Sequence, residues 1–305
     1  MACPTACSTI TPIIRTTVPT ITGIDRSGPL PSFFEALSYD FLRNALIAGV
    51  LASVLCGVIG TFVVVKKLAF ISDGISHAAF GGMGVCFYLG IDPLLGAIPV
   101  ALVCALALGA VDRETISSYD ALIGVLWAVG MAVGVVFVYK TPGYAPNLMT
   151  YLFGNILLVS HHDLRVILVL AVSVLTLLFL FFKGIVAVAF DEVFARVRGV
   201  RVRFLMSLLL TLIALSVVIL IQIVGIILVV ALLTIPSVIS LMLFRDLKAV
   251  LAGSVLTGVA ITLGGLVLSF YYDLPSGPAI ILLGAVLLVG AYGFKKIRRR
   301  GLAAS

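Results

Sequence analysis

An aspartate and a histidine lie four residues apart in a small-residue-rich stretch, LAFISDGISHAAFGGMG, at residues 68–84. Residues at positions i and i+4 of a helix share one face, so Asp73 and His77 can act on the same ligand. Carboxylate and imidazole together suit divalent Zn, Mn or Fe. Two ligands make an incomplete site, but a second copy of the chain beside this helix would supply a four-ligand metal site.

The same two residues also fit a structural role. Asp73 could cap a helix that begins at Gly74, and His77 could be a hydrogen-bonded packing residue. Small residues follow the pair: Ala78, Ala79, Gly81, Gly82 and Gly84. They permit close backbone approach, which suits a dimer axis or a narrow pore as well as ordinary tight packing. Spacing alone leaves both interpretations open.

Composition places this pair inside a membrane protein. The chain is 62% hydrophobic and 11% charged, with a mean hydropathy of +1.28, whereas soluble proteins are about 45–50% apolar and about 25% charged. Its apolar runs are long and unbroken, so we expect an all-α polytopic membrane protein. Eight or nine transmembrane helices are predicted from these segments: 41–65, 68–90, 94–111, 120–140, 163–183, 205–224, 226–244, 249–271 and 279–295.

Helix geometry gives the depth of the candidate ligands. At about 1.5 Å per residue from Lys67, Asp73 lies about 9 Å and His77 about 15 Å into the membrane. The hydrocarbon core is about 30 Å thick, which puts His77 near its midplane. A carboxylate at the centre of a span costs about 2.5–3.5 kcal/mol or more, so a partner, water or an ion must offset that cost.

Three regions and an orientation follow from the distribution of polar residues. Residues 1–39, rich in Thr, Ser, Pro and Ile, are expected to be a poorly ordered extracytoplasmic extension. Residues 40–296 form the transmembrane domain, and 297–305 a basic cytoplasmic tail. Most of the 20 Lys and Arg residues fall on the side of Lys66, which places the carboxyl terminus in the cytoplasm and the amino terminus outside a cell membrane. This clustering explains the net charge of +7 without a nucleic-acid partner.

Several kinds of site are absent from the sequence. It has no GxxxxGK[ST] phosphate loop, no GxSxG and no HExxH, so we expect a transport subunit rather than an enzyme, with any ATPase on another chain. It also has no CxxC pair and therefore no structural zinc site. His161 and His162, beside Asp163, could recruit a metal or simply form a solvated end of a span.

A second polar stretch, AFDEVFARVRGVRVRF at 189–204, resembles a short amphipathic helix. Phe190, Phe194 and Val197 recur at i, i+4 and i+7, which predicts one apolar stripe. Acidic residues begin the segment, basic residues end it, and a glycine is placed to stop it, in keeping with the helix dipole. Such a helix could dock into the groove of a cytoplasmic partner or rest on the membrane surface.

Together these stretches resemble the permease subunits of ATP-driven zinc, manganese and iron importers, the ABC-3 metal-permease family, from about residue 41 to 296. The stretches that carry the resemblance are FVVVKKLAFISDGISHAAFGG, DALIGVLWAVGMAVGVV, YLFGNILLVSHHDL, AFDEVFARVRGV, GIILVVALLTIPSVIS and YYDLPSGPAIILLGA. Several matches in one order are more specific than any single match.

The resemblance implies a permease fold like that of type II importers. It also implies a second permease chain, identical or paralogous, a cytoplasmic ABC ATPase dimer and an extracytoplasmic metal-binding protein, with no permanently bound cofactor. It places Asp73 and His77 on the path of the transported metal. It identifies residues 190–199 as the cytoplasmic coupling helix that docks on the ATPase, with these coupling residues: Phe190, Asp191, Glu192, Phe194, Ala195, Arg196 and Gly199.

Two other functions remain open at this point. A secondary cation carrier could use Asp73 as an ion or proton relay, and it would need an ion gradient in place of an ATPase chain. An intramembrane enzyme would need a second catalytic group at membrane depth, where only Asp73 and His77 are evident. The identity of the metal is also open, because Mn, Zn and Fe all accept these ligands.

Overall fold

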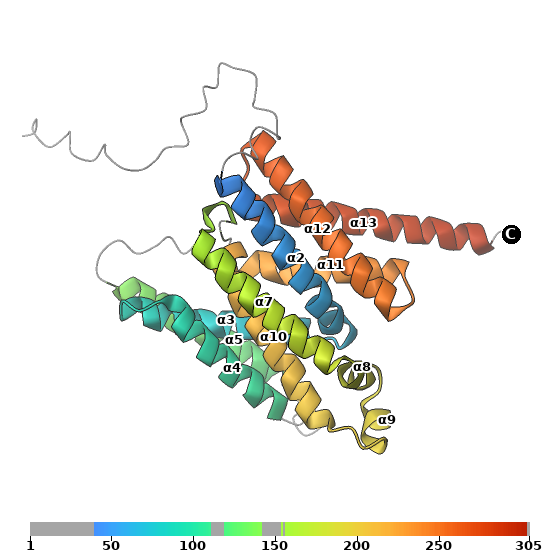
Figure 1. Ribbon diagram of the computed structural model, residues 1–305, viewed down its shortest axis with the longest axis horizontal. Coiled ribbons are helices and arrows are strands. Elements are labelled where there is room, and N and C mark those ends of the chain that lie inside the picture. The colour runs from blue at the N-terminus through green and yellow to red at the C-terminus, as the bar shows by residue number, and fades with distance from the viewer. Residues whose placement is uncertain (1–39, 111–118, 142–153, 155, 304–305) are drawn as a thin grey trace, which may run out of the picture.

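The computed structural model describes residues 40–110, 119–141, 154 and 156–303, and these form a bundle of helices (Figure 1). The expected extension at 1–39 lies outside the described residues. Within them, eight helices are long and apolar enough to cross a membrane. These are α2 (Asp40–Val65), α4 (Pro93–Ala110), α5 (Tyr119–Lys140), α7 (His161–Leu180), α10 (Val202–Val224), α11 (Ile226–Leu243), α12 (Leu247–Tyr272) and α13 (Ser276–Ala303).

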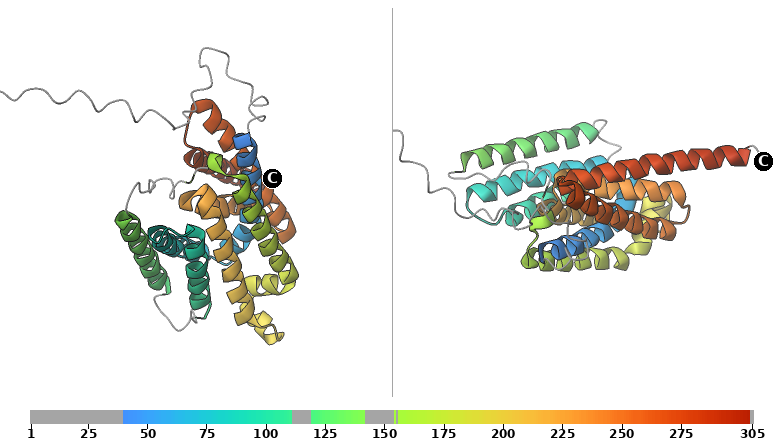
Figure 2. Two further views of the ribbon diagram at one scale, coloured as in Figure 1. Left: turned by 60° about the vertical axis from the view of Figure 1, so that its left-hand side comes forward. Right: turned by 90° about the horizontal axis from the view of Figure 1, so that it is seen from above.

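A further helix, α3 (Ala69–Tyr88), carries the candidate site. Its 20 residues match the thickness of a hydrocarbon core, which a helix of about 20 residues spans. Asp73, His77 and several glycines make it less apolar than the eight. It contacts α4, α5, α10 and α11, and the view from above shows it between α5 and the rest of the bundle (Figure 2). The predicted eight or nine spans are therefore eight strongly apolar helices and one shielded helix.

The helices form two groups that α10 connects. The first group is α3, α4 and α5, and the second is α2, α11, α12 and α13; α10 contacts α3 and α4 on one side and α2 and α11 on the other. Buried hydroxyls fix α2 against α12. The oxygens of Ser53 and Thr262 are 2.9 Å apart, and Thr61 donates to Ser254 over 3.1 Å.

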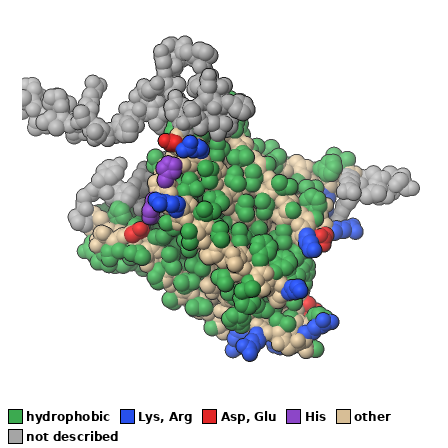
Figure 3. Space-filling model, viewed as in Figure 1, with side chains coloured by type: hydrophobic (Ala, Val, Ile, Leu, Met, Phe, Trp, Pro, Cys, Tyr) green, Lys and Arg blue, Asp and Glu red, His purple; other side chains and the backbone are tan. Residues whose placement is uncertain are grey.

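The remaining elements lie at the ends of the bundle. The short helices α8 (Phe182–Phe190) and α9 (Glu192–Val197) connect α7 to α10, and the 3₁₀ turn η1 (Ile156–Leu158) precedes α7. The predicted basic tail continues α13 as far as Ala303. Charged side chains gather toward the ends of the visible face and leave a broad hydrophobic band between them (Figure 3). That band is the surface expected of a chain that spans a bilayer.

The contact between α3 and α5 depends on glycines. A methyl group placed on Gly81 would lie 2.8 Å from the carbonyl oxygen of Gly130, and one on Gly84 would lie 2.6 Å from that of Gly134. The reverse also holds, since a methyl group on Gly130 would lie 2.5 Å from the Cα of Ala78. The GxxxG spacing at Gly130 and Gly134 therefore lets the backbone of α5 touch that of α3.

This contact predicts different effects for two alanine substitutions on α5. Gly130→Ala should lower the thermal unfolding temperature of the detergent-purified chain, because forced overpacking costs about 1–3 kcal/mol. Gly124→Ala is the matched control, since a methyl group there meets no atom within 4 Å. Circular dichroism during heating measures both. Equal unfolding temperatures for the two variants would contradict the close α3–α5 contact.

Candidate metal site on α3

Asp73 lies inside α3 and not at its start. The helix begins at Ala69, and Leu68 occupies the N-cap position. The interpretation of Asp73 as the cap of a helix starting at Gly74 is therefore wrong, because the backbone is already helical four residues earlier. As the i,i+4 spacing predicts, Asp73 and His77 lie on one face, with 3.5 Å between Oδ1 of Asp73 and Nε2 of His77.

This separation suits a shared ion better than a direct hydrogen bond. Hydrogen bonds from nitrogen to oxygen are about 2.7–3.2 Å long, and the two atoms are farther apart than that. Bonds of about 2.1 Å from one ion to both atoms would meet at an angle of about 113°, close to the tetrahedral geometry that Zn²⁺ prefers. The separation is therefore compatible with one divalent ion between the two side chains.

The pair is largely shielded but not sealed. The side chain of Asp73 is 24% exposed and that of His77 is 12% exposed. In the part of the chain that the structure describes, the buried Nδ1 atom of His77 has no hydrogen-bond partner, which does not favour a role for His77 as a hydrogen-bonded packing residue. Among the described residues no group of three or more His, Cys, Asp or Glu could hold a metal ion. One chain offers two candidate ligands, and the partial exposure of the pair leaves access for others.

The indole of Trp127 on α5 covers the imidazole of His77. The two ring centroids are 5.0 Å apart, with 39° between the planes. The close approach at Gly130 brings α5 to this position, since a methyl group there would lie 2.7 Å from the carbonyl oxygen of His77. Sequence reasoning missed Trp127, because its partner lies 50 residues earlier. The one available signal was that it is the single tryptophan of the chain.

The predicted coupling helix is shorter than the sequence indicated. It is α9, and it begins at Glu192, whereas Phe190 is the last residue of α8. The break occurs at Asp191, whose extended backbone lets its carboxylate accept a hydrogen bond of 2.9 Å from the N–H of Phe194. A strong N-cap therefore overrides the apolar repeat, and Phe190 does not belong to one stripe with Phe194 and Val197.

The predicted end of the helix is confirmed. Gly199 has a φ of +76°, which glycine adopts without strain. Its N–H bonds to the carbonyl of Arg196, and the N–H of Val200 bonds to that of Ala195. These two bonds form a Schellman motif, which satisfies the free carbonyls of the last turn.

The side chains of α9 divide between the protein and its surroundings. Ala195 is 1% exposed and lies on the side of α9 that packs against the bundle, where α9 contacts α8 and α10, so it is not placed to touch a partner directly. Val193, Phe194 and Val197 are exposed, and the guanidinium of Arg198 lies 4.7 Å from the ring centre of Phe194. An apolar face rimmed by basic residues thus points away from the bundle.

The two histidines that begin α7 are part of a helix end. Ser160 caps α7 by accepting from the N–H of Asp163, and the Asp163 carboxylate accepts in return from the N–H and hydroxyl of Ser160. His161 and His162 are exposed, and the His162 ring nitrogen lies 3.9 Å from Asp163. The capping role occupies Asp163, which favours a solvated span end over a metal site.

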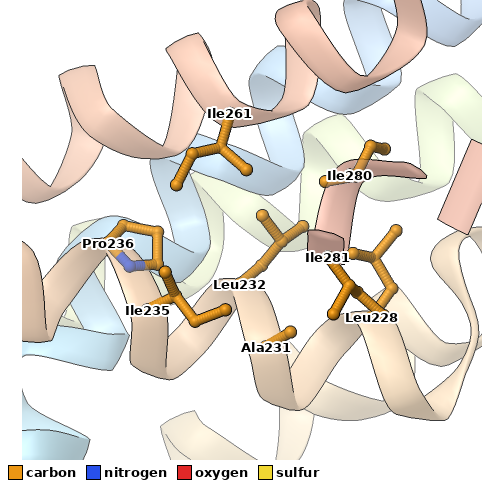
Figure 4. Close-up of a pocket in the computed structure, with 8 residues that line it drawn as sticks. All are labelled: Leu228, Ala231, Leu232, Ile235, Pro236, Ile261, Ile280 and Ile281. Carbon is orange, nitrogen blue, oxygen red and sulfur yellow. The ribbon is translucent and has the colours of Figure 1, made fainter. Parts of the chain in front are cut away.

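A hollow beside Pro236 offers no ion path. The hollow lies between α11, α12 and α13 and is too narrow to hold a water molecule (Figure 4). Only apolar side chains line it: Leu228, Ala231, Leu232, Ile235, Pro236, Ile261, Ile280 and Ile281. A lining without oxygen or nitrogen ligands cannot replace the hydration of an ion.

Comparison with known proteins agrees with the predicted family. The model of the ABC 3 transport family matches residues 38–295, so the chain belongs to that family. An uncharacterised membrane protein of Synechocystis sp. is 40% identical over 279 residues, which cover 91% of this chain and 99% of the relative. The manganese transport system membrane protein MntC of Halalkalibacterium halodurans is 35% identical over 262 residues, 86% of this chain and 90% of the relative.

A solved structure shows the same fold. PsaBC from Streptococcus pneumoniae, solved in complex with a Fab, is 30% identical and superposes with a TM-score of 0.77 over 85% of this chain and 94% of that chain. The predicted all-α, multi-pass ABC-3 permease fold is thereby confirmed.

The ring contact with Trp127 predicts an effect on metal binding. Trp127→Leu should weaken Mn²⁺ binding by about 2- to 10-fold, because an aromatic pair contributes about 0.5–1.5 kcal/mol to holding the imidazole in place. Trp127→Phe keeps a ring over His77 and should retain most of the affinity. Titration of the purified protein with Mn²⁺ measures all three. A Leu variant that binds as tightly as wild type would show that Trp127 does not position His77.

Proposed function

We propose that this chain is the membrane permease subunit of an ABC transporter that imports a divalent transition metal ion, Mn, Zn or Fe. The observation that carries the proposal is the Asp73–His77 pair, spaced to bind one ion on a shielded helix. Membership of the ABC 3 transport family supports it. A 35% identical relative named as a manganese transport protein supports the class of cargo.

The ion is held between two copies of the chain. Each copy contributes one carboxylate and one imidazole, and the paired copies together provide a four-ligand site. The partial exposure of both side chains is consistent with a second chain completing the site. An external metal-binding protein delivers the ion, and closure of the cytoplasmic ATPase dimer opens the site to the other side.

The metal is cargo and not a resident cofactor. A site that must release its ion in each cycle binds less tightly than a structural site with four ligands from one chain. Carboxylate and imidazole accept Mn²⁺, Zn²⁺ and Fe²⁺, and selectivity among these ions depends on geometry and supply. Selection among the three metals is therefore assigned largely to the external protein.

The apolar face of α9 is the surface that docks on the ATPase. Val193, Phe194 and Val197 are exposed there, Phe190 is exposed just before it at the end of α8, and Arg196 and Arg198 add positive charge. Asp191 and Gly199 act indirectly by starting and ending the helix, and Ala195 anchors it to the bundle. This arrangement supports the cytoplasmic placement of α9 together with Lys66 and the carboxyl terminus, with the amino terminus outside.

Metal uptake into vesicles that contain the chain and its ATPase tests the role of the pair. Asp73→Asn and His77→Gln should each lower ATP-dependent metal uptake by more than about tenfold, because losing even a residue that only supports a ligand costs about 10- to 100-fold. Asp92→Asn is the matched control: this exposed carboxylate caps α4, and asparagine caps equally well. Wild-type uptake by correctly inserted Asp73→Asn chains would refute the site.

A charge on the exposed face of α9 separates an ABC transporter from a secondary carrier. Val197 is 82% exposed, so Val197→Asp should leave folding intact yet weaken association with the ATPase by about tenfold or more, since an unpaired charge is costly in an interface. Leu158→Asp, on an exposed residue of η1, is the control. Co-purification and uptake are measured together. A secondary carrier would keep full gradient-driven uptake with Val197→Asp and without any ATPase.

A further inference from the structure

One ion pair joins the end of α2 to the start of α9. The Nζ atom of Lys66 lies 2.5 Å from Oε1 of Glu192, across 126 residues of sequence. The Lys66 side chain is 12% exposed and that of Glu192 is 41% exposed. A pair with one well-shielded partner is screened less by solvent than a surface ion pair, and removal of either charge leaves the other without its partner.

On one side of this pair, α9 is a stiff unit. Glu192 is its first residue, directly after the capping residue Asp191, and Gly199 closes the other end. Ala195 follows Glu192 by three positions, so both lie on the face toward the bundle, and Ala195 is buried there. A displacement of α9 therefore moves the Glu192 carboxylate with it.

On the other side, Lys66 is tied to the start of α3. Lys67 adopts the left-handed conformation with φ +56°, its N–H bonds to the carbonyl of Val64, and the N–H of Leu68 bonds to that of Val63. The fully buried Leu68 is also the N-cap position of α3. This Schellman motif fixes the backbone between α2 and α3. Asp73 follows Lys66 by seven residues.

On the Lys66 side of the ion pair, α2 is held in place. The hydroxyl contacts from Ser53 and Thr61 to α12, and the backbone contact at Gly57, hold α2 against sliding. A methyl group on Gly57 would lie 2.7 Å from the backbone nitrogen of Val255. A force applied at Lys66 is therefore transmitted through the rigid corner between α2 and α3 to the start of α3, the helix that carries the candidate ligands.

We infer that the Lys66–Glu192 ion pair links the position of α9 to the arrangement of Asp73 and His77. The inference rests on the proposed function, in which the ATPase moves α9 during each cycle. Lys66 and Glu192 are positioning residues: neither binds the metal, and neither belongs to the exposed apolar face of α9. Without the pair, ATP hydrolysis continues, but less metal is imported for each ATP hydrolysed.

The test uses the chain together with its ATPase in vesicles, with metal uptake and ATP hydrolysis recorded in the same sample. Lys66→Gln and Glu192→Gln should each lower the ratio of metal imported to ATP hydrolysed by about fivefold or more, the range of a typical coupling between sites. Lys67→Gln is the matched control, because Lys67 is adjacent, exposed and equally charged. It should keep the wild-type ratio.

The exchanged pair Lys66→Glu with Glu192→Lys separates a link from a purely structural contact. Restoring opposite charges should recover part of the lost ratio, whereas each single reversal should not. An unchanged ratio in both glutamine variants would overturn the inference. A lower melting temperature with proportionally lower uptake, and an unchanged ratio of uptake to hydrolysis, would also overturn it.

Failure of the proposed function gives a different result. If wild-type vesicles import no metal with ATP, the transporter assignment fails and the ion pair has no process to couple. If wild-type vesicles import metal and both glutamine variants keep the wild-type ratio of metal imported to ATP hydrolysed, the transporter assignment stands and the ion-pair inference fails.

Discussion

A carboxylate inside a membrane helix is the constraint on which the rest of this structure depends. Asp73 lies where lipid cannot solvate it, and a charged group at such a depth costs several kcal/mol unless something replaces its water. In the fold, α4, α5 and α10 pack around α3. His77 offers a partner atom at a distance that leaves room for an ion. Close packing and an incomplete ligand set are thus two aspects of one constraint.

The two groups of helices are held together by different kinds of contact. In the group of α2, α11, α12 and α13, buried hydroxyl pairs and backbone contacts hold α2 in place. In the other group, α3 and α5 meet along glycines, and the side chains of Ile123 and Phe80 pack against Gly74 and Gly134. The candidate ligands therefore lie on a helix that is closely packed against α5 and directly follows the anchored α2 in the chain.

Much of the fold was predictable because it follows from local rules. Long apolar runs predicted the spans, and the i,i+4 spacing predicted that Asp73 and His77 share a face. The glycine at 199 predicted the end of α9. The start of α9 was not predicted, because the apolar repeat from Phe190 suggested a longer helix and the cap at Asp191 was stronger. Sequence reasoning placed Asp191 in the first turn and did not weigh its side chain as a cap.

The contacts that could not be predicted are those between distant segments. Trp127 covers His77 because two helices approach at Gly130, and Lys66 meets Glu192 because the end of α2 lies beside α9. Neither relation leaves a periodic pattern in the sequence. Both involve residues that a search for metal-binding types would pass over, so the candidate ligands are recognisable from sequence while these contacts are not.

The central claim is that one ion is held by Asp73 and His77 of two chains, and counting bound ions tests it most directly. Electron paramagnetic resonance of Mn²⁺ added to the purified permease–ATPase complex gives the number of ions per pair of chains. Electron–nuclear double resonance on the same sample detects coordinating imidazole nitrogen. The account predicts one Mn²⁺ per two chains, with nitrogen couplings that disappear in His77→Gln. One ion per chain, or nitrogen couplings that persist in His77→Gln, would contradict it.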